Sequence, residues 1–157
     1  MPRELIPYVT ATYTAIFALL VIALVPREDI RKLAIHGMVF GAIVDVLVIA
    51  SGKLLGAFEY VDHGPLVWLG LPFFAPISWA LFFIMYFYFL PEKRPWNYVY
   101  TALGIIYSVL FGNLLVNLGI MRYFSDQTWV RLLLALAVFT PWFAGATWGY
   151  YRLRKHL

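Results

Sequence analysis

The chain has 157 residues and no cysteine; 63% of its residues are apolar and only 13% are charged. A soluble domain is about 45–50% apolar and about 25% charged, so this composition excludes a water-soluble globular protein, a disordered chain and a disulfide-rich scaffold. The net charge is +4 and the mean hydropathy is +0.80. Because the basic residues lie in short segments between long apolar runs, they indicate a multi-pass membrane protein and not a partner of nucleic acid.

Five apolar segments are long enough to cross a bilayer as helices, which takes about 20 residues each. The expected spans are 7–25, 30–52, 66–90, 97–119 and 129–151. They predict an all-α integral membrane bundle of five transmembrane helices, with one domain over residues 1–157. We expect the first span to be a retained helix, because its apolar run is longer than the core of about 7–15 residues in a cleaved signal peptide.

The basic residues also predict an orientation. Eight Lys and Arg residues flank the spans on the side of the C-terminus, and four lie on the other side. Since Lys and Arg concentrate in cytoplasmic segments, we expect the N-terminus outside and the C-terminus in the cytoplasm.

Small residues repeat at every fourth position in three of the expected helices, and such stripes allow two membrane helices to approach closely. The stripes are Gly37-xxx-Gly41, Gly104-xxx-Ser108-xxx-Gly112 and Ala137-xxx-Pro141-xxx-Gly145-xxx-Gly149. They predict packing within the bundle. Pro72 and Pro76 in the third span and Pro141 in the fifth predict kinks.

Asp45 is the one acid well inside an expected span. A carboxyl group at the centre of a membrane helix costs about 2.5–3.5 kcal/mol on insertion scales, so it is a functional candidate by default. The alternative is a structural role, in which its hydrogen bonds hold helices together. At a rise of about 1.5 Å per residue, several polar groups fall in the same outer half of the membrane: Asp45, Asn113, Asn117, Tyr13, Ser78 and Trp79. They predict a polar cluster, with Asn113 as the nearest partner of Asp45, that serves as a pocket open to the outside or as a hydrogen-bonded lock.

Other titratable residues carry weaker signals. His36 is expected to be a packing histidine on the face opposite Asp45. Glu59 is a second candidate for acid–base chemistry, but the segment 59–65 is expected to be a solvated turn and not a metal site. We therefore expect neither a metal nor a cofactor. The aromatic third span suits an isoprenoid-like ligand, or plain packing and lipid contact.

Two resemblances add to this interpretation. The stretch Met85-Tyr86-Phe87-Tyr88-Phe89-Leu90-Pro91-Glu92-Lys93, Trp96, Asn117-Leu118-Gly119-Ile120 and Arg122-Tyr123 resembles a group of small, uncharacterised multi-pass membrane proteins of spore-forming Firmicutes. That resemblance covers the last half of the chain and implies a bacterial cell (inner) membrane, with no activity to carry over. The succession Gly56-Ala57-Phe58-Glu59-Tyr60, Gly70-Leu71-Pro72 and Trp79 is similar to that of integral-membrane carotenoid hydratases and cyclases, which implies an isoprenoid ligand.

Three hypotheses of function follow. The first is a non-enzymatic accessory subunit or a binding module for a lipid-like ligand. The second is a small enzyme that modifies isoprenoids or lipids, with Asp45 and Glu59 as catalytic candidates. The third is a transport subunit with Asp45 in the path. The expected partners are membrane lipid, a second copy of the chain or another membrane protein, and an isoprenoid-like ligand.

Overall fold

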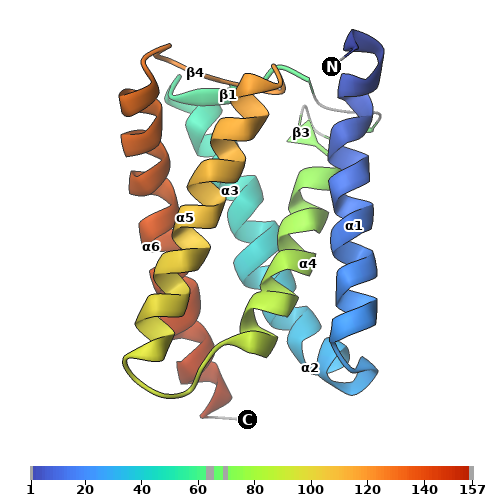
Figure 1. Cartoon of the computed structure of the whole chain (residues 1–157), viewed down its shortest axis with the longest axis vertical. Helices are drawn as coiled ribbons and strands as arrows, with labels where there is room; N and C mark the ends of the chain where they lie inside the picture. Colours follow the sequence, from blue (N-terminus) through green and yellow to red (C-terminus); the bar gives the residue numbers. More distant parts are fainter. Residues whose placement is uncertain (1, 63–65, 69–70, 156–157) are drawn as a thin grey trace.

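Long helices run side by side between the two ends of the bundle (Figure 1). The computed structural model describes residues 2–62, 66–68 and 71–155. Its helices are η1 (Arg3–Tyr8), α1 (Val9–Leu24), α2 (Arg27–Gly37), η2 (Met38–Ile43), α3 (Val44–Leu54), α4 (Phe74–Phe89), α5 (Trp96–Asn117) and α6 (Thr128–Arg154). Its strands are β1 (Phe58–Tyr60), β2 (Val67–Trp68), β3 (Leu71–Pro72) and β4 (Met121–Tyr123). The predicted helical bundle is confirmed, with very short strands added to it.

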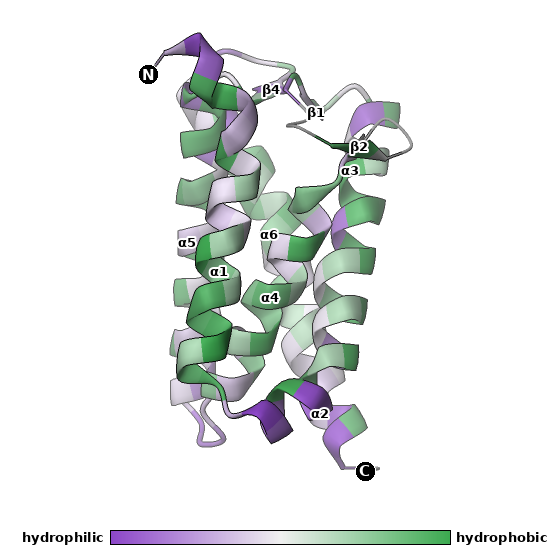
Figure 2. Cartoon of the chain, turned by 90° about the vertical axis from the view of Figure 1, so that its right-hand side faces the viewer, coloured by the Kyte–Doolittle hydropathy of each residue, from purple (hydrophilic) through white to green (hydrophobic). Residues whose placement is uncertain are grey.

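Four helical stretches of the described residues are long and apolar enough to cross a membrane. They are Arg3–Leu24, Arg27–Leu54, Trp96–Asn117 and Thr128–Arg154. Apolar residues fill the middle of the bundle and hydrophilic residues gather mainly at its two ends, as Figure 2 shows. This distribution is the one that a bilayer requires of a multi-pass protein.

The expected third span, 66–90, is wrong at its beginning. Residues 67–68 and 71–72 form the antiparallel strands β2 and β3, and α4 starts only at Phe74. The predicted kinks are absent there, because Pro72 lies in a strand and Pro76 in the first turn of α4, where backbone N–H groups have no intrahelical partner. With 16 residues, α4 is about 24 Å long, which is shorter than a hydrocarbon core of about 30 Å.

The expected second span is one helical stretch with a π-helix, η2, in its middle. A π-helix interrupts the regular i to i−4 ladder and leaves carbonyl groups free to bond elsewhere. Here the Trp142 indole N–H on α6 donates a hydrogen bond of 2.6 Å to the Phe40 carbonyl. This contact fixes α6 against the irregular turns that come just before Asp45.

The small-residue stripes pack as predicted at several positions. A Cβ atom on Gly41 would lie 2.4 Å from the Trp79 carbonyl oxygen, and one on Gly37 would lie 2.7 Å from that of Ala80. The helical stretch Arg27–Leu54 therefore contacts the backbone of α4 directly. The prediction is wrong at Gly145, where a Cβ atom would meet nothing within 4 Å, and Gly112 has ordinary van der Waals room.

Helices α3 and α5 each end in a turn of the same type, with a glycine of positive φ. Gly56 and Gly119 have φ angles of 65° and 77°, a left-handed conformation that glycine adopts without steric cost. The next N–H of each chain segment bonds back to the carbonyl five residues earlier, Ala57 to Gly52 and Ile120 to Leu115, which is a Schellman motif. Both turns lead into strands, and β1 and β4 pair antiparallel across one end of the bundle, here called the sheet end (Figure 1).

Candidate functional site

A small cavity lies among the helices below the β1–β4 sheet. It offers about 40 Å³ to the centres of water-sized molecules, which is room for about three waters. We call it the Asp45 cavity. Its described lining residues are Tyr13, Asp45, Val48, Ile49, Phe58, Tyr60, Trp79, Phe111, Gly112, Leu115, Met121, Tyr123, Ala135, Val138, Phe139 and Trp142.

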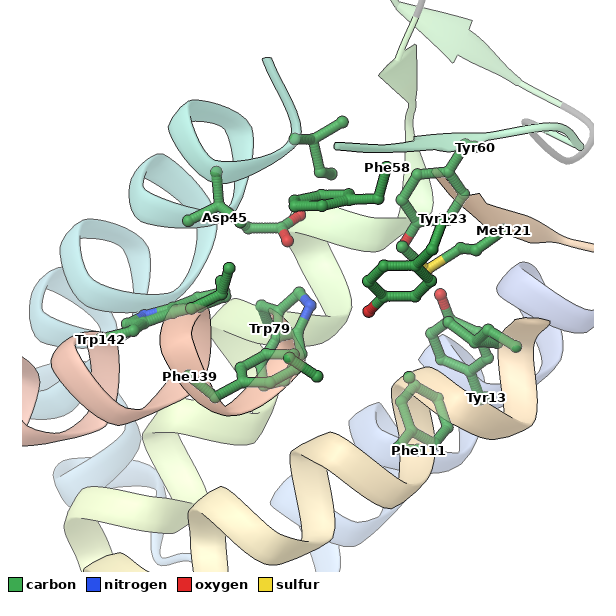
Figure 3. A pocket seen from close by; sticks show the side chains of 16 residues that line it. Tyr13, Asp45, Phe58, Tyr60, Trp79, Phe111, Met121, Tyr123, Phe139 and Trp142 are labelled. Carbon is green, nitrogen blue, oxygen red and sulfur yellow. The ribbon is translucent and has the colours of Figure 1, made fainter. Parts of the chain in front are cut away.

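The carboxyl group of Asp45 points into this cavity (Figure 3). The residue is only 3% exposed, which agrees with the expectation that it faces the bundle interior. Its Oδ2 atom is buried and has no hydrogen-bond partner in the described part of the chain. Buried polar atoms in proteins are almost always hydrogen-bonded, so an orphan carboxyl oxygen calls for an explanation.

Aromatic rings of α4 and α6 form one wall of the cavity. The Trp79 ring centroid lies 4.8 Å from that of Trp142 and 5.6 Å from that of Phe139, and the last two are 5.7 Å apart. These separations are typical of favourable aromatic pairs. Three helical segments meet through these rings, because the Trp142 indole is also bonded to η2.

Tyrosines from three separate elements supply the remaining polar groups: Tyr13 on α1, Tyr60 on β1 and Tyr123 on β4 (Figure 3). Burial raises the pKa of the Tyr60 phenol well above its usual value, and the neighbouring Tyr13 and Asp45 raise it further. Tyr60 therefore stays a neutral donor and acceptor across the physiological pH range.

The sheet places its side chains alternately, as the period of two in a strand requires. Phe58 and Tyr60 are buried and line the cavity, whereas Glu59 between them points away and forms an ion pair with Arg122 on the paired strand. Glu59, the second catalytic candidate from sequence, therefore lies on the face of the sheet opposite the Asp45 cavity.

Of the other residues predicted for the cluster, some line the cavity and some do not. Tyr13 and Trp79 line the cavity with Asp45. Ser78 is buried next to Trp79, but its hydroxyl donates to the Ala75 carbonyl at 2.8 Å.

The two asparagines do not belong to the cluster. Asn117 is exposed, and Asn113 lies outside the described lining with its own Oδ1 unpaired. The expected hydrogen bond between Asp45 and Asn113 is wrong. Both side chains were matched by depth along their helices, and depth says nothing of the direction around a helix axis.

Sequence reasoning missed the lining residues Tyr60, Tyr123 and Trp142. The first two carried a readable signal, since Phe58-Glu59-Tyr60 and Met121-Arg122-Tyr123 each alternate apolar and charged side chains after a Leu-Gly pair. Trp142 carried none, because its role depends on a π-helix more than 90 residues away in sequence.

A second polar network in the opposite half of the bundle was also missed. The Tyr86 hydroxyl lies 3.0 Å from Thr101 Oγ1 and 2.8 Å from Thr147 Oγ1, which joins α4, α5 and α6. Its polar atoms bond to one another, so it has the character of a structural lock.

His36 has the packing role expected for it. It is buried, its ring meets that of Tyr150 edge-on at 5.3 Å, and its Nδ1 atom lies 3.3 Å from the Lys32 carbonyl oxygen. No group of three or more His, Asp or Glu side chains that could hold a metal occurs in residues 2–62, 66–68 and 71–155. The expected solvated turn at 59–65 is wrong at Glu59 and Tyr60, which belong to strand β1 with Tyr60 buried. Residues 63–65 of that segment lie outside the described residues.

No family model, curated protein or solved structure matches this chain. The function is therefore argued from the geometry of the Asp45 cavity.

Proposed function

We propose that this chain is a multi-pass protein of a bacterial cell membrane that binds a lipid-like ligand in the Asp45 cavity, as a binding module without catalytic activity of its own. One observation carries the proposal: a buried carboxyl oxygen without a partner points into an aromatic-lined space inside the bundle. Ligand sites are typically concave and mostly apolar, with a few polar groups that orient the ligand. An intramembrane acid is also expensive unless it serves such a purpose.

The proposed arrangement in the membrane has five crossings, with α4 and the β2–β3 hairpin together making the third. The N-terminus and the sheet end then lie outside, and the C-terminus lies in the cytoplasm. The basic residues support this orientation, because eight of the twelve belong to the end of the bundle opposite the sheets. Exposed Trp96 at that end and Trp129 at the sheet end fit the aromatic belts found at membrane interfaces.

Binding fits the cavity better than acid–base catalysis. General acid–base chemistry uses titrating groups within hydrogen-bond reach of the reacting atoms. Among the described lining residues, the only titratable side chains besides Asp45 are tyrosines. Glu59 lies on the other face of the sheet and pairs with Arg122. A carboxyl group surrounded by phenols and apolar rings is suited to holding a ligand in one orientation.

The proposal is tested by identifying what the protein retains on purification. The protein is extracted in dodecyl maltoside, and bound small molecules are measured by mass spectrometry per mole of protein. The test variant is Gly112→Val, whose side chain enters the cavity near Tyr123 and Phe139. The matched control is Gly145→Val, which adds the same group where a Cβ atom meets nothing within 4 Å.

We expect the wild type and Gly145→Val to retain the same lipid-like compound, and Gly112→Val to lose most of it while remaining folded by circular dichroism. Equal retention in all three proteins would place the compound elsewhere and overturn the proposal. If Gly112→Val fails to fold, the smaller Gly112→Ala replaces it, since a Cβ atom there makes only ordinary contacts of 3.7 and 3.8 Å.

A further inference from the structure

The described residues around the cavity supply no positive charge to Asp45. Among the described residues that line the cavity, Asp45 is the only charged side chain. An ionised carboxylate in an apolar interior is strongly disfavoured unless a cation or several hydrogen bonds compensate it. Neither is provided for the Oδ2 atom within the described part of the protein.

The carboxyl group of Asp45 indicates the charge of the ligand. A neutral hydroxyl or amide of a ligand could be held by an asparagine or a serine, and the chain already has such residues in its helices, as Ser78 and Ser108 show. What an aspartate adds is negative charge. That charge is useful only where the ligand, or a proton, brings the opposite charge.

The lining favours a cation on independent grounds. The faces of Trp, Tyr and Phe rings carry partial negative charge and attract ammonium groups, most strongly when water is excluded. Trp79, Trp142 and Phe139 are clustered on one side, and the phenol oxygens of Tyr13, Tyr60 and Tyr123 come from the other elements (Figure 3). An aromatic box with one carboxylate is the chemistry by which quaternary ammonium groups are recognised.

The size of the cavity decides between a compact head and an extended chain. Room for about three waters corresponds to about 90 Å³ of liquid, which suits an ammonium head of a few heavy atoms. A long polyene would need a longer channel than this small space, which Phe58 and Tyr60 of the sheet line on one side.

We infer that the ligand of the Asp45 cavity is an organic cation, whose ammonium head sits between the Asp45 carboxylate and the surrounding aromatic rings; this inference rests on the proposed binding function and names its ligand class. Asp45 neutralises the charge of the head, and Trp79 and Trp142 line the space beside it.

The test compares two probes of the same shape. Choline carries a trimethylammonium group, and 3,3-dimethylbutan-1-ol replaces its nitrogen by carbon and is neutral. Their affinities for the purified protein in dodecyl maltoside, a detergent without charge, are measured by isothermal titration calorimetry. The variants are Asp45→Asn and, as a control for loss of an acid, Asp126→Asn on the exposed turn before α6.

We expect the wild type and Asp126→Asn to bind choline at least about tenfold more tightly than the neutral probe. In Asp45→Asn the affinities for choline and for the neutral probe should be about equal. The same preference in Asp45→Asn and the wild type would place the cation elsewhere and overturn the inference.

Two further outcomes separate this inference from the proposed function. If both probes bind equally well and Gly112→Val abolishes both, the ligand class is neutral: the inference falls, and the binding function stands. If neither probe binds and the purified protein retains no compound that depends on Gly112, both fall.

Discussion

The unpaired oxygen of Asp45 has a cost that can be measured. Leaving a buried polar atom without a partner costs about 1–3 kcal/mol, and the Oδ2 atom of Asp45 is in that position. The sequence predicts Asn113 as the nearest partner of Asp45, and with such a bond Asp45→Leu would lower the free energy of unfolding. Because the structure has no such bond, we expect the opposite sign.

We predict that Asp45→Leu raises the free energy of unfolding by about 1–3 kcal/mol, because it removes the orphan oxygen and fills part of the cavity. Asp45→Asn should change stability little, since an amide is as polar as the acid it replaces. Thermal unfolding in dodecyl maltoside, followed by circular dichroism, measures both. A lower melting temperature for Asp45→Leu alone would mean that the carboxyl group has a stabilising partner. Gain of stability on loss of a functional group is a common trade-off in binding sites.

At the level of elements, η2 packs against α4 backbone to backbone. Gly41 allows it, because a Cβ atom there would lie 2.4 Å from the Trp79 carbonyl oxygen, and a backbone atom cannot rotate away. This contact also sets where Trp79 enters the Asp45 cavity.

We predict that Gly41→Ala lowers the free energy of unfolding by about 1–3 kcal/mol, the usual cost of overpacking. The control is Gly145→Ala, which adds the same methyl group to open space and gains helix propensity. Both are compared with the wild type by thermal unfolding in the same detergent. Equal melting temperatures for the two variants would show that α4 and η2 can separate without loss.

An element can be predicted from sequence when local hydropathy determines it, and not when contacts with remote residues do. The long apolar runs predict α1, α5 and α6 to within a few residues, because the bilayer imposes a minimum length on a spanning helix. The same criterion misassigned residues 67–68 and 71–72, since hydropathy does not separate short apolar strands from the first turns of a helix. The π-helix η2 has no local signal, because it is stabilised by Trp142, which is remote in sequence.

Over the whole molecule, the site was predictable in part. Asp45 was found because an acid in an apolar run is rare and costly, and its inward direction follows from the same cost. Of its neighbours in the cavity, Tyr13 and Trp79 were predicted. Most of the others were not, because the lining comes from five helical elements and a sheet whose pairing joins residues about 60 positions apart. Such contacts follow from the way in which the helices pack, and no short stretch of sequence contains them.

The topology of the whole chain gives the last prediction. The chain has no cysteine, so single cysteines can be introduced without background labelling. Exposed positions mark the two ends of the bundle: Val67 and Asp126 lie at the sheet end, and Arg94 lies in the turn between α4 and α5 (Figure 1). Each is changed to cysteine and treated, in spheroplasts, with a maleimide that cannot cross membranes.

Because basic residues concentrate at the end that carries Arg94, we expect that end to face the cytoplasm. Cysteines at Val67 and Asp126 should then react in intact spheroplasts, and the one at Arg94 only after the membrane is disrupted. The opposite pattern would reverse the orientation. Labelling of both Val67→Cys and Arg94→Cys from outside would show that α4, at about 24 Å, does not complete a crossing, so that the chain would have four spans instead of five. That result would also contradict the fold, because α4 carries the chain away from the sheet end and α5 returns it, which brings the lining residues of α3 and α5 to the same level of the bundle (Figure 1).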